Sequence, residues 1–218
     1  RLLNANRKPA PRLDYFVRDY LLWHRMEYPS SHYRTAQVLL DHILPRFGLL
    51  PMNLIRPGEV EQFKSERRFL AKASTVGKEL RVFQAVMNRA CKLGLIERNP
   101  VAIVKAPRIL DSKPHRFYEA DELATIYPSP YGEVWRLMAN TGVRRTEALL
   151  LRRAWIGAES MKILSTEEDR TKSGKWREIP LSDGARIALE RLEGTDYVLP
   201  RIQPESLSRA FLRDAGRV

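Results

Sequence analysis

Residues 140–155 read NTGVRRTEALLLRRAW, in which a turn-forming glycine and an arginine pair precede a run with helical composition. The expected helix begins near Arg144. Glu147 follows about one turn later, where its carboxylate could orient the guanidinium or the local backbone. Helix N-termini present free N–H groups and partial positive charge, so an arginine beside one could bind a phosphate through both arms of its guanidinium. A capped surface helix with a solvated arginine has the same pattern, so both interpretations stay open for this stretch alone.

A second stretch, EDRTKSGKWREIPL at residues 168–181, contains a lysine within a predicted hairpin. The flanking segments MKILS and WREIPL have the alternation and the β-branched or aromatic residues of strands, and TKSGK between them has turn chemistry. A lysine at a hairpin tip, here Lys172, can enter a groove or donate a proton. An ordinary exposed turn also contains lysine and glycine, so this stretch alone does not decide.

Basic residues are concentrated in the first half of the chain. The 218 residues carry a net charge of +12. Residues 1–108 contain 20 Lys and Arg against nine Asp and Glu, a net of +11, whereas residues 109–218 contain 18 against 17, a net of +1. A polyanion bound mainly by the first half is the natural interpretation, and a basic protein without such a partner is the alternative.

The composition excludes several classes of protein. The chain is 44% hydrophobic and 29% charged, which is typical of a soluble globular protein, and no apolar run approaches the length of about 18 residues that a membrane span needs. The single cysteine, Cys91, excludes an internal disulfide framework and a cysteine-based zinc site. No cluster of metal ligands is visible, so neither a metal nor a cofactor is expected. A reducing, intracellular compartment fits best.

Helical periodicity dominates the first half. Apolar residues recur at helical spacing from Leu13 to Leu21, from Tyr33 to Phe47 and from Val60 to Leu70. The clearest helix spans residues 74–96, and its apolar side carries Leu80, Phe83, Met87, Ala90 and Cys91. The opposite side carries four cations, which we call the basic stripe: Lys78, Arg81, Arg89 and Lys92. A solvated face and a phosphate-binding surface are both consistent with this stripe.

Prolines interrupt the helical rhythm near the middle of the chain. We predict a tail over residues 1–11, a helical domain over 12–105, a linker over 106–117 and a second domain over 118–218. The second domain mixes helical segments with the two strands, and Ser182 is expected to cap one of its helices. The expected fold class is therefore mainly α with a small β-sheet.

Taken together, the two motifs resemble those of the tyrosine recombinase family, the phage-type integrases. The family pattern Thr-Gly-x-Arg-x-x-Glu matches residues 141–147, and the hairpin lysine follows 28 residues after Arg144. The matched hairpin positions are Thr171, Lys172, Arg177, Pro180 and Leu181. GLIERNPVAIVKAPR resembles the segment that leaves the family's core-binding domain, and TDYVLPRIQPESLSRAFLRDAG resembles the stretch ahead of the family's second motif box.

The resemblance implies a helical SAM-like core-binding domain followed by an α+β catalytic domain that exchanges DNA strands at specific sites. In this family a tyrosine attacks a DNA phosphate and forms a 3′-phosphotyrosyl link. Two arginines and a histidine hold the phosphate oxygens, and a lysine protonates the leaving 5′-oxygen. Arg144 would be the first arginine and Lys172 the proton donor, with Glu147 in support. Arg145, Arg177 and the basic stripe would contact DNA, and no metal is needed when side chains supply the positive charge.

The resemblance also implies partners and a location. The partners are duplex DNA with an attachment site, other protomers in a synaptic tetramer, and two accessory proteins, namely a host DNA-bending protein and an excisionase. No membrane partner is expected. A phage or prophage protein of this kind would act in the bacterial cytoplasm, at the nucleoid.

One departure from the family pattern affects the chemistry. The family places a His-x-x-Arg box and the nucleophilic tyrosine after the lysine. All four histidines precede Lys172, and none begins such a box. The only later tyrosine, Tyr197, lies in DYVLP, which we expect to be a structural strand. The catalytic domain is therefore expected to be incomplete in this chain, which would bind DNA without cutting it.

Two alternatives remain open. One is a DNA-binding protein that derives from the same fold and never cuts. The other is a helical module that binds RNA or protein, with an accidental motif match. A gene that continues into the missing box would select the recombinase, and a natural stop after Val218 would favour the first alternative. Loss of all duplex binding at moderate salt would favour the second.

Overall fold

The computed structural model describes residues 10–110, 117–165, 174–199 and 202–216. The chain divides into two compact units, unit 1 (Arg1–Pro114) and unit 2 (His115–Val218). No helix within the described ranges is long and apolar enough to cross a membrane.

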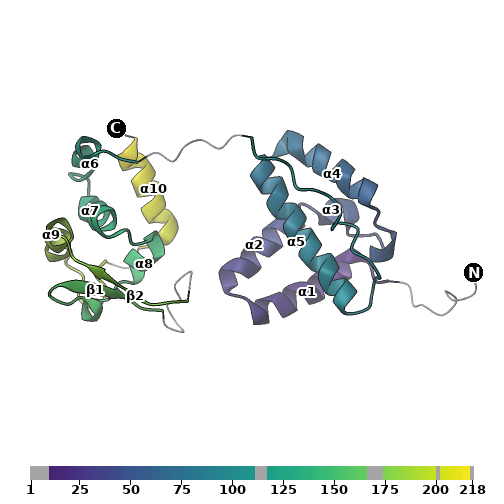
Figure 1. Ribbon diagram of the computed structural model, residues 1–218, viewed down its shortest axis with the longest axis horizontal. Helices are drawn as coiled ribbons and strands as arrows, with labels where there is room; N and C mark the ends of the chain where they lie inside the picture. Colours follow the sequence, from purple (N-terminus) through teal and green to yellow (C-terminus); the bar gives the residue numbers. More distant parts are fainter. Residues whose placement is uncertain (1–9, 111–116, 166–173, 200–201, 217–218) are drawn as a thin grey trace, which may run out of the picture. The chain divides into compact units, whose positions relative to one another are not determined.

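Unit 1 is built from helices (Figure 1). They are α1 (Leu13–Glu27), α2 (Ser30–Asp41), α3 (Leu44–Phe47), a short 3-10 helix (Met52–Leu54), α4 (Pro57–Leu70) and α5 (Ala73–Lys92). The apolar spacing of the sequence explains them, because residues three or four apart share one face of a helix. In α1, the buried residues Leu13, Phe16, Val17 and Tyr20 follow this spacing. The helical prediction for the first half is confirmed.

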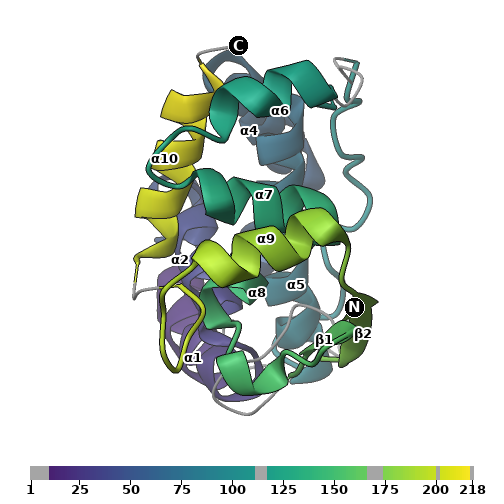
Figure 2. The ribbon, with the colours of Figure 1, turned by 90° about the vertical axis from the view of Figure 1, so that its left-hand side faces the viewer.

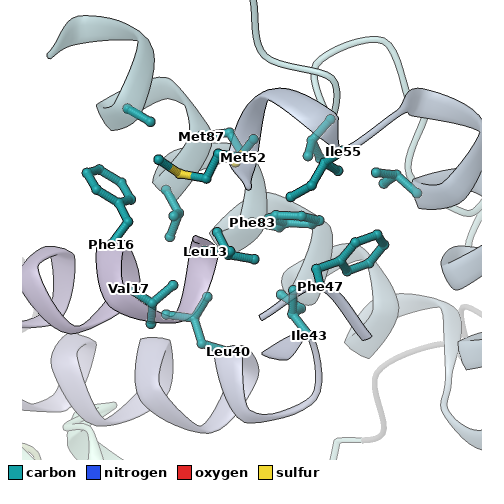
Figure 3. Close-up of a cluster of buried hydrophobic side chains, with 14 of the residues drawn as sticks. Leu13, Phe16, Val17, Leu40, Ile43, Phe47, Met52, Ile55, Phe83 and Met87 are labelled. Carbon is teal, nitrogen blue, oxygen red and sulfur yellow. The ribbon is translucent and has the colours of Figure 1, made fainter. Parts of the chain in front are cut away.

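One face of α5 is buried in the core of unit 1. Leu80, Phe83, Met87 and Ala90 are at most 4% exposed, as their spacing predicted. Figure 3 shows Phe83 close to Phe47 of α3, and their ring centroids are 5.2 Å apart. Full burial of one large apolar side chain stabilises a fold by about 1.5–3 kcal/mol. This face therefore fixes the orientation of α5, and with it the direction of the basic stripe on the opposite side.

Glu79 is a fully buried carboxylate on α5 that the sequence did not predict. Arg67 of α4 donates to both of its oxygens, from Nε to Oε2 at 3.0 Å and from Nη2 to Oε1 at 2.6 Å. Nδ1 of His42, which follows α2, lies 2.8 Å from Oε1. The hydrogen bond to Glu79 raises the pKa of Arg67. A buried charge needs such partners, so Glu79 joins α5 to α4 and to the end of α2.

The end of the predicted tail packs on unit 1. Ala10 is buried, and the Pro11 carbonyl accepts a hydrogen bond from the Met52 amide at 3.1 Å. Residues 1–9 lie outside the described residues. The packed part of unit 1 thus includes Ala10 and Pro11.

Unit 2 combines helices with a two-stranded sheet. Its elements are α6 (Ala120–Ile126), α7 (Gly132–Thr141), α8 (Arg145–Leu150), a 3-10 helix (Arg153–Trp155), β1 (Ser160–Ile163), β2 (Arg177–Pro180), α9 (Asp183–Arg191) and α10 (Pro204–Ala215). β1 and β2 pair antiparallel, with Ile163 opposite Arg177. The two strands and the fold class, mainly helical with a small sheet, agree with the prediction. The expected hairpin tip around Lys172 lies outside the described residues.

α7 lies against α9 in unit 2 (Figure 2). Nε1 of Trp135 on α7 donates to Oδ2 of the buried Asp214 on α10 at 3.0 Å. The Ser182 hydroxyl accepts a hydrogen bond from the Ala185 amide at 3.3 Å, which confirms the predicted cap of α9. These contacts fix α7, and the turn after α7 positions the site described below.

Removing the Arg67 guanidinium should destabilise unit 1, because the buried Glu79 charge would lose its bidentate partner. Arg67→Met is expected to lower the free energy of unfolding by about 3 kcal/mol, and adding Glu79→Leu should restore most of the loss. Amide hydrogen exchange in α5 measures both effects. Glu66→Gln is the control, since Glu66 is half-exposed in its pair with Arg46, and it should cost less than about 1 kcal/mol. Equal losses in the single and double variants would contradict the role of Glu79.

Candidate functional site

The turn between α7 and α8 places Arg144 at the start of a helix. Gly142 ends α7 with a φ of +64°, and its amide donates to the Met138 carbonyl at 2.9 Å. Glycine adopts this left-handed conformation without steric cost, which lets the chain leave one helix and soon begin another. Val143 is buried, and Arg144 occupies the N-cap position of α8, as the sequence predicted.

Glu147 holds both the backbone and the side chain of Arg144. Its carboxylate accepts a hydrogen bond from the Arg144 backbone N–H at 2.8 Å and another from Nη1 of the guanidinium at 2.9 Å. The Glu147 side chain is only 3% exposed. The bond to the backbone satisfies an N–H at the helix start, in the manner of a capping box. The sequence left open whether Glu147 orients the guanidinium or the backbone, and the structure shows that it does both.

A second arginine reaches the same carboxylate from β2. Arg177 donates from Nη1 to Oε1 of Glu147 at 2.9 Å and from Nη2 to Oε2 at 2.6 Å. The sequence predicted a DNA contact for Arg177, and it missed this ion pair. The two residues are 30 positions apart in the chain, and nothing in their spacing indicates the pair. Only the packing of β2 near the start of α8 brings them together.

The two arginines keep Glu147 ionised. The hydrogen bonds from Arg177 are the largest cause, and those from the Arg144 backbone and side chain add to it. They lower the pKa of Glu147 from 4.5 to about 2, although burial opposes ionisation. The same bonds raise the pKa of Arg177. Two guanidinium groups and one carboxylate leave this cluster with a net positive charge.

Among the residues that the structure describes, Arg144 keeps most of its hydrogen-bonding capacity. Its side chain is 54% exposed, and within the described ranges its guanidinium donates to Glu147 through Nη1. A guanidinium has five N–H donors in a planar fork, so an acceptor with two oxygens can still bind it in bidentate fashion. The arrangement can therefore hold an anion such as a phosphate at the start of α8.

Of the other site residues predicted in unit 2, the structure describes Arg145 but not Lys172. Lys172, the predicted proton donor, lies outside the described residues. Arg145 is half-buried and donates to the Ser208 hydroxyl on α10, so its guanidinium connects α8 to α10. A DNA contact by Arg145 stays a prediction.

The basic stripe of unit 1 is not uniformly exposed. Lys78, Arg81 and Lys92 are exposed on α5, as expected. Arg89 is half-buried, and its guanidinium lies 4.1 Å from the ring centroid of Trp23 on α1. A cation–π contact contributes roughly 0.5–2 kcal/mol. Arg89 thus helps to join α1 to α5, which sequence spacing could not indicate.

Tyr197 is held by Arg152. It lies in an isolated β-bridge with Arg152, and not in the longer strand that the sequence predicted. Its hydroxyl accepts a hydrogen bond from Nη2 of Arg152 at 2.8 Å.

Metal-ligating side chains are not gathered in the described part of the chain. His, Cys, Asp and Glu side chains form no group of three there that could hold a metal ion.

Neutralising Glu147 should change the acid sensitivity of unit 2. Folding lowers the pKa of Glu147 from 4.5 to about 2, so its ionic contribution to the unfolding free energy is complete above about pH 4.5 and is lost as the pH falls towards 2. That contribution is on the order of 3 kcal/mol. Glu147→Gln is therefore expected to be less stable than the parent near neutral pH, and this difference should shrink across that window.

Urea unfolding followed by tryptophan fluorescence measures this difference. A Trp23→Phe background confines the signal to unit 2, because the other tryptophans all lie there. Leu137→Ala serves as the control, since it removes buried apolar surface and its deficit should not depend on pH. A Glu147→Gln deficit that stays constant down to about pH 2 would contradict the ionised pair.

Comparisons with known proteins identify the fold. No family model matches the sequence, and no curated protein matches it. The crystal structure of a lambda integrase dimer bound to a COC′ core site matches with a TM-score of 0.79 and 18% identity, over 94% of this chain and 78% of that one. A lambda integrase tetramer bound to a Holliday junction matches with a TM-score of 0.79 and 18% identity, over 95% of this chain and 64% of that one.

A transposon protein has the same fold. The Tn1549 integrase in complex with a circular intermediate DNA matches with a TM-score of 0.71 and 14% identity, over 88% of this chain and 69% of that one. At such identities the likeness concerns the fold, and it extends over residues of both units. The chain therefore has the fold of the lambda and Tn1549 integrases, which are tyrosine recombinases.

Proposed function

We propose that this chain is part of a tyrosine recombinase and binds duplex DNA for site-specific recombination. The observation that carries the proposal is the Arg144–Glu147 pair, in which a buried carboxylate holds an exposed guanidinium at the start of α8. The integrases of the same fold are bound to DNA in their structures. Phage or prophage origin is the finer form of this proposal, and it rests on the sequence motifs alone.

Unit 1 is proposed to supply most of the DNA affinity. Residues 1–108 carry a net charge of +11, and the exposed residues of the basic stripe lie along one helix. Lysine and arginine side chains that neutralise phosphates release condensed counterions from the duplex. Such binding is strong, salt-dependent and largely independent of base sequence.

Unit 2 is proposed to act at the phosphate where the strand is exchanged. In this chemistry a tyrosine hydroxyl attacks phosphorus, the bond from phosphorus to the 5′-oxygen breaks, and the leaving oxygen takes a proton from Lys172. Arg144 would bind the non-bridging phosphate oxygens, where negative charge must be stabilised in the transition state. Glu147 would keep Arg144 in the orientation that this role requires.

The 218 residues of this chain support DNA binding better than DNA cutting. No histidine follows Lys172 in the 218 residues. The Tyr197 hydroxyl is engaged with Arg152, which favours a structural role. We therefore propose that this chain binds DNA without forming a phosphotyrosyl link.

Other protomers are proposed as partners, since lambda integrase is seen as a dimer and as a tetramer on DNA.

Reversing charge on the basic stripe should weaken binding to many duplex sequences alike. Lys78→Glu combined with Arg81→Glu is expected to lower duplex affinity about tenfold or more, and to reduce the slope of log affinity against log salt by about 0.9 for each lost phosphate contact. Fluorescence anisotropy with two unrelated duplexes at several salt concentrations measures both quantities.

The control makes the same charge change elsewhere in unit 1. Arg68→Glu combined with Arg98→Glu alters exposed residues on α4 and after α5. This variant should keep most of the salt slope. If both variants lose the same affinity, net charge and not the basic stripe governs binding. Affinity that does not depend on salt would contradict DNA binding through phosphates.

The chain should bind its DNA site without forming a covalent adduct. A duplex selected for binding from a random pool can be nicked beside the site so that any cleavage is trapped. A denaturing gel would then show no protein–DNA adduct, because the identified groups hold a phosphate but provide no nucleophile. An adduct that forms with the parent chain and disappears with Tyr197→Phe would show that Tyr197 is the nucleophile.

A further inference from the structure

We propose that Arg177 is a positioning residue that keeps Arg144 free for phosphate by occupying Glu147, and that it does not itself contact DNA. This inference rests on the proposed function of Arg144. It gives Arg177 a different role from the DNA contact that the sequence predicted.

The hydrogen bonds around Glu147 use its full accepting capacity. Oε1 accepts from Nη1 of Arg144 and from Nη1 of Arg177, both at 2.9 Å. Oε2 accepts from the Arg144 backbone N–H at 2.8 Å and from Nη2 of Arg177 at 2.6 Å. A carboxylate offers about four lone-pair sites. With Arg177 in place, no site on Glu147 is left for a second N–H of the Arg144 guanidinium.

Loss of Arg177 would release two of these four sites. Arg144 already donates to Glu147 through Nη1, and its guanidinium could then turn to bind Glu147 with two N–H groups. That pair would take up two of the five N–H donors of Arg144 and turn its planar fork towards Glu147, so fewer donors would remain for a phosphate. Arg177 therefore prevents an internal pairing that would compete with the phosphate.

Charge gives a second reason for the same role. A carboxylate beside a phosphate-binding arginine repels the phosphate and cancels the charge of the arginine. Arg177 supplies the opposite charge, and its bidentate bonds are the largest cause of the lowered pKa of Glu147. The Glu147–Arg177 pair is neutral as a unit, so the positive charge of Arg144 remains available to the ligand.

The position of Arg177 suits a rigid support. It is the first residue of β2, opposite Ile163 of β1, a residue that is only 2% exposed. Its guanidinium therefore extends to Glu147 from a paired strand. The Arg177 side chain is 34% exposed, compared with 54% for Arg144. A direct phosphate contact by Arg177 is the competing role, and it predicts a different pattern of mutant affinities.

A double-mutant cycle separates the two roles. Duplex affinity is measured for the parent chain, Arg177→Met, Arg144→Ala and the double variant. If Arg177 acts through Arg144, Arg177→Met should weaken binding about tenfold in the parent background and less than about twofold in the Arg144→Ala background. An equal loss in both backgrounds would mean that Arg177 contacts DNA directly, and it would overturn the proposal.

A measurement without DNA tests whether Arg177 supports Glu147. Carbon-13 labelling of glutamate side chains lets the carboxyl of Glu147 be titrated by NMR. Arg177→Met should raise the pKa of Glu147 by more than about one unit, and Arg177→Lys should leave a smaller rise because lysine keeps the charge but not the fork. Arg191→Met, which removes a 61% exposed arginine elsewhere in unit 2, is the matched control and should leave this titration and the duplex affinity unchanged.

The affinity cycle and the Glu147 titration test different claims, so a failure of one can be told apart from a failure of the other. If the chain binds no duplex, the proposed function fails, and the titration still decides whether Arg177 supports Glu147. If Arg177→Met leaves the Glu147 titration unchanged, the proposal is overturned whatever the DNA affinity. Far-ultraviolet circular dichroism of each variant confirms that the helices are retained, and Arg177→Lys replaces Arg177→Met in the cycle if the latter does not fold.

Discussion

The Glu147 carboxylate is the constraint on which the candidate site depends. It is buried, it is ionised, and it accepts four hydrogen bonds from two arginines on separate elements. A buried charge is stable only when such partners surround it, so the start of α8 and the start of β2 must stay together. The left-handed Gly142 and the pairing of β2 with β1 provide the backbone geometry that this requires. Arg144 is consequently held at its backbone N–H and at Nη1, while its side chain stays 54% exposed.

Unit 1 contains a comparable arrangement with a different result. Glu79 is also buried and bound by an arginine, but its partners Arg67 and His42 join helices of the core. Arg67 is 18% exposed on its side chain, so little of its guanidinium is left for a ligand. The same chemistry therefore stabilises packing in unit 1 and presents a cation in unit 2. The difference lies in the exposure of the arginine and not in the type of ion pair.

The sequence predicted what depends on local or periodic pattern. The apolar face of α5, the two strands, the Ser182 cap and the closeness of Arg144 to Glu147 all follow from spacings of a few residues. It did not predict contacts between polar side chains that are distant in the chain. The Arg177–Glu147 and Arg67–Glu79 pairs and the stacking of Arg89 on Trp23 belong to this group. Such contacts depend on how the elements pack, which periodicity does not encode. The site role of Lys172 stays a prediction, because that residue lies outside the described ranges.

The central claim is that Arg144, held by Glu147, binds one particular DNA phosphate. A methylphosphonate scan tests it most directly, because each substitution removes the charge of a single phosphate in a selected duplex. The account predicts one position at which the neutral substitution weakens binding by the parent chain about tenfold but leaves binding by Arg144→Ala nearly unchanged. If every substitution weakens binding by the two proteins equally, Arg144 contacts none of the scanned phosphates, and the account is contradicted.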